Sequence, residues 1–537
     1  MKLTLGKLIV ATLILGLVIG GSFFALRVTP RHGTGRAMTH SQRPESQSPD
    51  SPSVGSSSTA VPSSTAVPSP TAVPSPTAVP SPTAVPSPTA GADDILSEDK
   101  QTNITGKFIA SPNPAESANK IESSSEWSRF RGPNGSGVSK DASIPSEWSD
   151  TQNLRWKTKL PGPGSSSPVL TDTHVFLTSY TGYGEEDRSK GQMSQLKRQL
   201  HCIDRNDGKI AWSQNIDALL PEDPYQGMGL PEHGYATNSP VTDGKSVFAF
   251  FGKTGVFAFD MAGNEQWKVS VGTESGNRGW GTAASLILYK DILIVNASEE
   301  SQTLFGINKN TGEVVWRAPG AILELAYGTP IIARVNDERD DLVIAVPSEV
   351  WGLNPNTGKL VWYVETKLTG NLSPSVIPDG DSIYVFGGYR SSGSLAIKLG
   401  GKGNVTQSNI LWNSRNSSYV VTPILHEGHL YWIDDQGMYF CVSAKTGETV
   451  DKQRVSGIQS GGRPVYASPV SIDGKLFMQT RNSGLFVLDG KPKLEVLKQN
   501  RFASDDSVFN ATPAISNGQL FLRSYTHLYC VMSEKSN

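Results

Sequence analysis

The chain has 537 residues, and its formal net charge of −2 gives no electrostatic basis for a nucleic-acid partner. Its 53 glycines and 11 tryptophans favour an all-β repeat protein over a helical one. The three cysteines, Cys202, Cys441 and Cys530, are too few for a disulfide framework, and no CxxC motif indicates a zinc or attached haem site.

The N-terminus carries a continuous run of apolar and small residues at 8–26. At about 1.5 Å per residue, this run is just long enough to cross a bilayer core of ~30 Å as a helix. Lys2 and Lys7 precede it, which also fits a signal peptide, but no small-x-small cleavage site follows. We therefore expect an uncleaved transmembrane signal-anchor at 8–26, with residues 1–7 as a short cytoplasmic end.

Residues 27–125 form a linker rich in Ser, Thr, Pro and Ala, with four copies of TAVPSP from Thr65 to Pro88. Frequent prolines favour an extended polyproline conformation of ~3.1 Å per residue and prevent a buried core. The arginines that follow the apolar run would by themselves favour a cytoplasmic domain. A long stalk suits a periplasm or cell wall better, so the sequence predicts a single-pass protein of a bacterial inner membrane with its domain outside.

From Leu154 onward the sequence repeats with a period near 45 residues. The marker of each repeat is a small residue, a proline and then an apolar strand. Its prolines are Pro168, Pro240, Pro330, Pro374, Pro423, Pro469 and Pro513, and Ala284 takes the marker position in one degenerate copy. Eight members of this period predict an eight-bladed, all-β propeller of four-stranded blades over residues 154–537, preceded by a lead-in segment at 126–153.

Tryptophan recurs at the end of the predicted fourth strand of the repeat, which follows a turn such as NTGK. These tryptophans are Trp212, Trp267, Trp316, Trp362 and Trp412, and Val450 and Val496 take their place in the sixth and seventh repeats. The last repeat lacks a fourth strand, and the strand around Trp156 is expected to supply it and to close the ring. We expect each of the six tryptophans to dock between neighbouring blades on the adjacent turn, as a packing residue rather than a ligand contact.

The cysteines occupy one column of the repeat, in the middle of the third strand. The same column holds Ala258, Gly306, Gly352, Ala396 and Val487. We interpret it as a position that requires a small side chain beneath the neighbouring blade, which predicts buried and unreactive thiols.

These repeats resemble the tryptophan-docking repeats of the pyrroloquinoline-quinone-like propeller family, including that of an outer-membrane assembly lipoprotein, over residues 154–532. The stretch EWSRFRGPNGSGVS (Glu126–Ser139) is similar to segments that precede such propellers in planctomycete-type envelope proteins. In the dehydrogenases of the family the resemblance implies a quinone capped by adjacent cysteines, a calcium ion held by Glu, Asn and Asp, and an Asp base. The sequence has no adjacent cysteine pair, so no catalytic residue or metal ligand is assigned and no cofactor is expected.

Two long insertions, Thr181–Gln199 and Asp217–Ala236, are expected on one face of the ring. Aromatic residues and arginines precede the repeat markers and should reach the channel mouth on that face. They are Tyr235, Arg278, Trp280, Tyr327, Tyr419, Arg463, Tyr466 and Phe509. They form a candidate binding face for an envelope protein or a small anionic or aromatic ligand, although these aromatics can equally well just fill the channel.

These features favour a membrane-tethered, non-catalytic binding or scaffold propeller of the cell envelope. Two other functions stay open: a divergent quinone-dependent dehydrogenase, which would need pyrroloquinoline quinone with calcium, and a carbohydrate-binding propeller.

Overall fold

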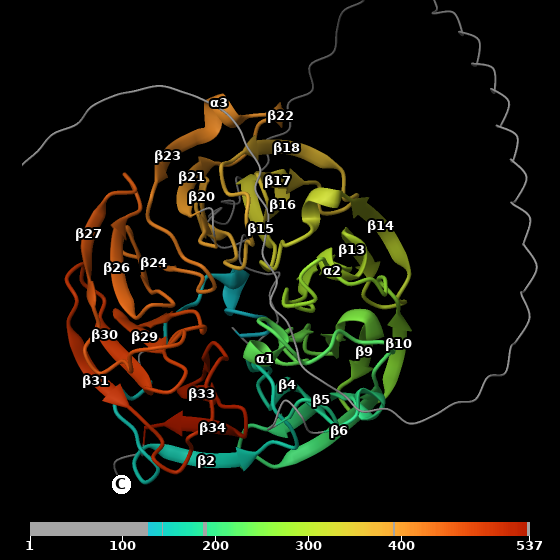
Figure 1. The fold of residues 1–537 in the computed structure, drawn as a ribbon, viewed down its shortest axis with the longest axis vertical. Coiled ribbons are helices and arrows are strands. Elements are labelled where there is room, and N and C mark those ends of the chain that lie inside the picture. The colour runs from blue at the N-terminus through green and yellow to red at the C-terminus, as the bar shows by residue number, and fades with distance from the viewer. Residues whose placement is uncertain (1–126, 142, 186–190, 390–391, 534–537) are drawn as a thin grey trace, which may run out of the picture. The chain divides into compact units, whose positions relative to one another are not determined.

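Eight antiparallel sheets surround a central channel in the computed structural model, which describes residues 127–141, 143–185, 191–389 and 392–533. Figure 1 shows these blades following one another around the ring in chain order. The all-β, eight-bladed architecture predicted from the repeat is therefore confirmed. The predicted segments at 1–7, 8–26 and 27–125 lie outside the described residues, and among the described residues no helix has the length and apolarity to cross a membrane.

Each blade has four strands, which follow one another from the channel to the outer edge of the ring. Blades one to four consist of β3 (Val169–Leu170), β4 (His174–Thr181), β5 (Lys197–Asp204) and β6 (Ile210–Asp217); β7 (Val241–Thr242), β8 (Ser246–Phe250), β9 (Val256–Asp260) and β10 (Glu265–Val269); β11 (Ile287–Tyr289), β12 (Ile292–Ala297), β13 (Thr303–Asn308) and β14 (Val314–Pro319); and β15 (Ile331–Asn336), β16 (Arg339–Val346), β17 (Glu349–Leu353) and β18 (Leu360–Glu365).

The remaining blades follow the same order. Blades five to eight consist of β19 (Ile377–Asp379), β20 (Ser382–Gly387), β21 (Gly393–Lys398) and β23 (Ile410–Ser414); β24 (Ile424–His426), β25 (His429–Ile433), β26 (Met438–Ser443) and β27 (Thr449–Arg454); β28 (Val470–Ile472), β29 (Lys475–Gln479), β30 (Leu485–Asp489) and β31 (Val496–Asn500); and β32 (Ala514–Ser516), β33 (Gln519–Arg523), β34 (His527–Met532) and β2 (Leu154–Lys159).

Short elements complete the fold. Two further strands extend blades seven and four, β1 (Val138–Ser139) and β22 (Gly403–Asn404), and the helical turns are η1 (Pro133–Gly135), η2 (Met193–Gln195), α1 (Leu230–His233), η3 (Gly252–Thr254), α2 (Ser298–Ser301), η4 (Ala321–Leu323) and α3 (Thr406–Asn409).

The two ends of the repeat region meet in blade eight. Strand β2 pairs antiparallel with β34, and Trp156 lies opposite Cys530. The last blade therefore takes its outer strand from the N-terminal side of the repeats, as the sequence predicts. This pairing removes the free sheet edge that would otherwise remain at the seam.

The tryptophans dock on the turn of the next blade in five of the six predicted cases. Each indole N–H donates to a backbone carbonyl of that turn at 2.9–3.1 Å: Trp156 to Arg205, Trp212 to Met261, Trp267 to Lys309, Trp316 to Pro355 and Trp412 to Ala444. A glycine at positive φ lies against each ring, and a Cβ there would come within 2.8 Å of the indole. The turn glycine is thus required both by the backbone and by the docked ring.

Trp362 departs from this pattern, because the corresponding connection of blade five is a longer segment that contains β22 and α3. Its indole instead donates to the Asp341 carboxylate of its own blade at 2.6 Å. Arg339 holds that carboxylate with two hydrogen bonds of 2.8 Å. The fully buried Trp362 is therefore fixed by a local polar network rather than by its neighbour.

The residue at the tryptophan position was predicted wrongly in blades six and seven, by one and by two residues. A β-bulge in each outer strand places Asp451 opposite Cys441 and Lys498 opposite Val487, so these residues occupy the tryptophan position. Val450 and Val496, which were expected there, are 48% and 41% exposed. The tryptophan-bearing outer strands have the same register shift, for example between Gly306 and Ile307, so the shift is not peculiar to these two blades and the error lies in the residues assigned to them.

The small residues in the column of the third strand have a different cause from the one expected. Gly306 lies directly opposite Trp316 in the same sheet, and a Cβ on Gly306 would come within 2.2 Å of that indole. The column therefore makes room for the blade's own tryptophan rather than for the neighbouring blade. The three cysteines in it are buried, and burial raises the pKa of their thiols to about 12 for Cys202 and Cys530 and to about 11 for Cys441.

Candidate functional site

A closed ring of eight hydroxyls encircles the channel. One Ser or Thr stands two residues before the first strand of each blade, and its backbone N–H donates to the hydroxyl of the next blade's residue at 2.9–3.1 Å. The members are Ser167, Ser239, Ser285, Thr329, Ser375, Thr422, Ser468 and Thr512. Because every hydroxyl oxygen accepts one N–H, its own proton stays available to a ligand.

This hydroxyl ring also corrects two of the repeat markers. The ring members Ser285 and Ser375 put Leu286 and Val376 at the marker position, where Ala284 and Pro374 were expected. An alignment of the repeats on proline fails in blade five, because Pro374 precedes Ser375 of the hydroxyl ring, whereas the other marker prolines follow their ring residue.

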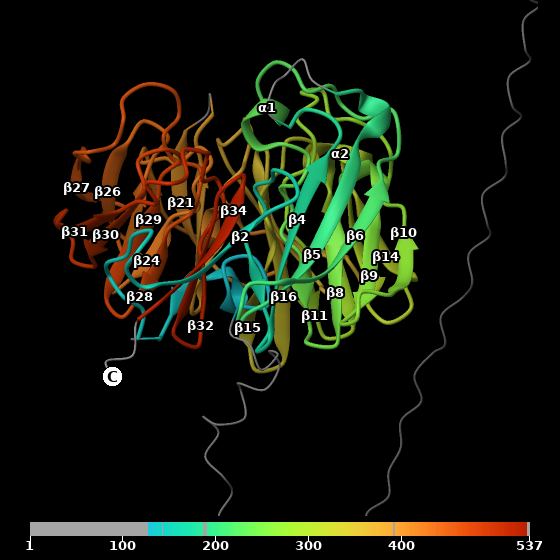
Figure 2. The ribbon, with the colours of Figure 1, turned by 90° about the horizontal axis from the view of Figure 1, so that it is seen from below.

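The lead-in segment lies on the side of the ring opposite α1, as Figure 2 shows for the blue end of the colour scale. Arg131 is fully buried there and donates to the carbonyls of Thr422, Pro423 and Pro469 at 3.0–3.4 Å. Burial lowers the pKa of Arg131 to about 9. Phe130 lines the channel above this plug, so the space over the hydroxyl ring is a blind cavity of about 500 Å³.

The two long insertions meet over the face of the ring opposite the lead-in segment, as predicted. The Ala218 N–H donates to the Leu196 carbonyl at 3.1 Å, which joins one insertion to the other. The turn α1 at the end of the second insertion reaches across the mouth, where Glu232 forms an ion pair of 2.9 Å with Arg481 of blade seven. The backbone carbonyl of Glu232 accepts from Asn510 at 2.8 Å. This turn is therefore fixed to blade seven and to the connection between blades seven and eight.

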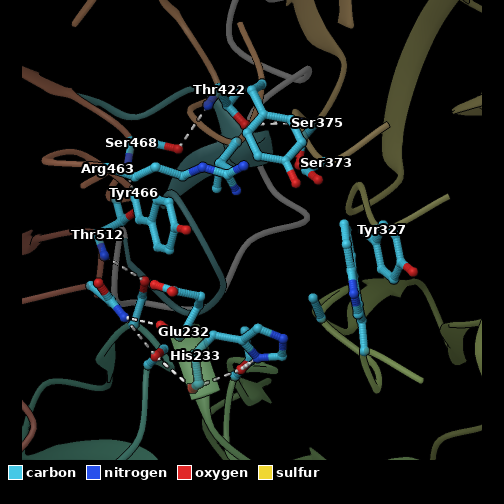
Figure 3. A pocket seen from close by; sticks show the side chains of 18 of the residues that line it. Glu232, His233, Tyr327, Ser373, Ser375, Thr422, Arg463, Tyr466, Ser468 and Thr512 are labelled. Carbon is cyan, nitrogen blue, oxygen red and sulfur yellow. Dashed lines mark hydrogen bonds between the residues drawn. The ribbon is translucent and has the colours of Figure 1, made fainter. Parts of the chain in front are cut away.

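Aromatic and arginine side chains line opposite walls of the cavity. Trp280 and Tyr327 stack with ring centroids 6.0 Å apart on one wall. Figure 3 shows Arg463 and Tyr466 on the wall facing Tyr327, and the Arg463 guanidinium lies 4.7 Å from the Tyr419 ring. Four of the aromatics and one arginine predicted for the binding face thus meet at one cavity.

The three other predicted residues lie elsewhere. Tyr235 is buried beneath the insertions, where its hydroxyl donates to the Asp223 carbonyl at 2.6 Å. Phe509 packs on Tyr529 between blades seven and eight. Arg278 is exposed and is not part of the cavity lining, although its guanidinium lies 5.6 Å from the Trp280 ring. Each precedes a marker by a different number of residues, so sequence proximity did not fix the side-chain direction.

Several lining residues were missed from the sequence: Phe130, Glu232, His233 and Arg481. The Ser or Thr before each proline was part of the marker itself, and its recurrence was the signal that could have indicated the hydroxyl ring. His233 is a neutral polar group here, because burial lowers the pKa of its imidazole to about 4.

Carboxylates gather behind the aromatic wall, outside the cavity. Glu299 and Glu300 of α2 are 3% and 2% exposed, and they lie near the buried pairs Arg198–Glu222 and Lys253–Asp223. Burial raises the pKa of Glu299 to about 7 and that of Glu300 to about 8. This cluster therefore binds protons near neutral pH.

Pyrroloquinoline quinone with calcium does not fit the cavity. Glu232 is the one carboxylate among its lining residues, and it is already paired with Arg481. Across the described ranges, no three His, Cys, Asp or Glu side chains are placed to hold a metal ion. The buried cysteines lie in three different blades and form no adjacent pair. No catalytic step through a quinone follows from these residues.

The fold and cavity define an eight-bladed propeller with one blind central pocket. The sequence model of the family described as outer membrane protein assembly factor BamB matches residues 192–345 and 324–453. This match confirms, over residues 192–453, the predicted resemblance to the pyrroloquinoline-quinone-like propeller repeat family.

Several solved structures are similar to this chain at low sequence identity. BamB from Moraxella catarrhalis is 14% identical, with a TM-score of 0.50 over 70% of this chain and 99% of its own. The computationally designed Ika8 protein is 11% identical, with a TM-score of 0.47 over 70% and 98%. A quinohemoprotein alcohol dehydrogenase from Comamonas testosteroni is 11% identical, with a TM-score of 0.42 over 78% and 82%. No functionally curated protein matches the sequence.

Proposed function

We propose that this protein is a non-catalytic binding propeller of the cell envelope, tethered by residues 8–26 to the inner membrane, with the blind central cavity as its binding site. The observation that carries the binding role is the cavity of about 500 Å³, closed by the plug and bordered by the hydroxyl ring and two aromatic walls. Its volume lies within the range of small-ligand sites, and its polar groups converge on one space.

The balance of donors and acceptors supports binding of an acceptor-rich occupant. Eight hydroxyl groups and the Arg463 side chain line the cavity, whereas its one carboxylate, on Glu232, is engaged by Arg481. A ligand that supplies oxygen acceptors would pair with these donors without desolvating an unpaired charge.

Ligand-observed NMR with a fragment library tests the cavity on the full chain. Ala283 lines the cavity, so Ala283→Trp should fill it and abolish most fragment binding. Ala211→Trp is the matched control, because Ala211 is exposed on the outer strand β6 and should change nothing. Fragments that bind both variants equally, or no fragment binding at all, would contradict the proposal.

The absence of catalysis is tested with the purified protein, added pyrroloquinoline quinone, calcium and an artificial electron acceptor. We expect no dye reduction with alcohols or sugars above the protein-free rate. Sustained reduction that Ala283→Trp abolishes would identify a dehydrogenase instead.

The tether is tested by membrane fractionation and alkaline extraction of the full chain. Residues 8–26 should keep it in the membrane pellet, and Leu15→Arg should release it, because a charge at the centre of a membrane helix is costly. A wild-type chain that alkaline treatment extracts completely would rule out the anchor.

A further inference from the structure

A second, apolar cavity lies between blades seven and eight, beside the central one. It measures about 310 Å³ and is lined by Leu485, Phe502, Phe509, Leu522 and, from the lead-in segment, Trp148. Trp148 stacks on Phe477 with an interplanar angle of 6°, so the lead-in segment supplies a fixed part of this lining. We call this space the side pocket.

Arg481 separates the side pocket from the central cavity and lines both. Its guanidinium is held by Glu232 at 2.9 Å and by the Asn510 amide oxygen at 3.0 Å, and it lies 4.6 Å from the Tyr466 ring. The partition is therefore fixed by bonds within the protein. An occupant of both spaces has to pass over it as a linear chain.

The central cavity and the side pocket differ in the kind of ligand group that their side chains favour. In the central cavity, Asp435 is the one carboxylate within 4 Å of Arg463 among the described residues, at 3.7 Å from Nε. The other groups at the guanidinium are the hydroxyls of Tyr466 and Tyr419, which carry no charge, so Arg463 can still attract a ligand carboxylate. At the side pocket, burial alone would raise the pKa of Asp505, but hydrogen bonds from Ser507, Ser524 and Tyr529 lower it to about 2. Arg481, Arg501 and Asp506 also line this pocket, so its formal charges balance and its apolar side chains favour an uncharged, apolar group.

Building on the proposed function, we infer that the partner is an extended peptide segment that places one large apolar side chain in the side pocket and a carboxylate at Arg463. The main chain crosses Arg481 between these two points. A deep apolar anchor next to a charged contact is the arrangement that gives protein interfaces their strongest single contributions. The exposed Asn482 side chain at the pocket border and the Gln436 amide in the cavity offer partners for peptide groups along the way.

Fluorescence anisotropy on the full chain tests this assignment with labelled peptides in which one to four glycines separate tryptophan from aspartate. At one spacer length, the two-feature peptide should bind at least tenfold more tightly than the peptides in which tryptophan is replaced by glycine or aspartate by asparagine. Ala503→Trp should remove the gain from tryptophan, because Ala503 lines the side pocket. Arg463→Gln should remove the gain from aspartate.

Ala211→Trp and Arg334→Gln are the controls, because both side chains are exposed and line neither cavity; they should bind the peptides like the wild type. The inference is overturned if no spacer gives a two-feature gain, if Ala503→Trp leaves the gain intact, or if benzoate alone binds as tightly as the peptide. In these cases fragment binding that Ala283→Trp abolishes would still support the central site. If fragments also fail to bind, the proposed function falls as well.

Discussion

The backbone N–H of Thr512 donates to the hydroxyl of Ser167 at 3.0 Å, across 345 residues of sequence. This bond closes the hydroxyl ring between the last and the first repeat. The antiparallel pairing of β2 and β34 completes the outer edge of blade eight, so the propeller is closed both at its channel and at its outer edge. Closure at the channel and at the outer edge makes the ring a cooperative unit rather than an open stack of blades.

Thr512→Val tests the contribution of the hydroxyl ring. Valine keeps the shape of threonine but removes the acceptor for the buried Ser468 N–H, which donates to Thr512 at 3.0 Å. An unsatisfied buried donor costs about 1–3 kcal/mol, so the free energy of unfolding measured with urea should fall by this amount. Thr512→Ser keeps the acceptor and should stay near the wild type; equal stability of the valine and serine variants would contradict the role of the hydroxyl.

Gly306→Ala tests why the third-strand column is small. A Cβ at this position would lie 2.2 Å from the Trp316 indole, and overpacking of this kind costs about 1–3 kcal/mol. Trp316→Ala alone should cost about 3–5 kcal/mol through the lost packing. In the Trp316→Ala background, Gly306→Ala should have almost no further effect on unfolding. Additive losses in the double variant would show that the indole is not what excludes the methyl group.

Arg131→Met tests the plug. Methionine fills part of the space but leaves the carbonyls of Thr422, Pro423 and Pro469 without their donor. We expect a loss of roughly 2–4 kcal/mol in thermal or urea unfolding, because several buried acceptors become unsatisfied together. Arg155→Met changes an exposed arginine of β2 and serves as the control. A plug variant as stable as this control would mean that the segment only rests against the channel.

The pH dependence of unfolding tests the carboxylates behind the aromatic wall. The pKa of Glu299 is about 7 and that of Glu300 about 8 in the folded protein, above the ordinary value of 4.5. Between about pH 4.5 and pH 8 the unfolded chain releases these protons while the folded chain retains them, so stability falls as pH rises. Each pKa unit corresponds to roughly 1.4 kcal/mol.

The double variant Glu299→Gln and Glu300→Gln should lose this part of the pH dependence. It should unfold at a higher temperature than the wild type at pH 8.5 and near the wild-type temperature at pH 4.5. Parallel melting curves for the two proteins across this range would show that the carboxylates are solvated in solution.

The residues of the candidate site could be predicted from the sequence only in part. Trp280, Tyr327, Tyr419, Tyr466 and Arg463 line one cavity, as their positions before the markers suggested. Tyr235 and Phe509 do not, because a residue at the end of a loop can point into the channel or back into its blade, and only packing against the insertions or against Tyr529 decides which.

The sequence by itself determined the number of blades, the closing strand and five of the six docked tryptophans, because each depends on contacts that repeat with a fixed period near 45 residues. The tertiary structure decided what does not repeat: the plug made by residues 127–139, the turn α1 across the mouth, the position of Trp362 and the side pocket beneath Arg481. These features join segments that are distant in the sequence, such as Arg131 and Pro469, 338 residues apart, or depend on one insertion. No local pattern of hydrophobic or turn residues encodes which distant segment such a residue will meet.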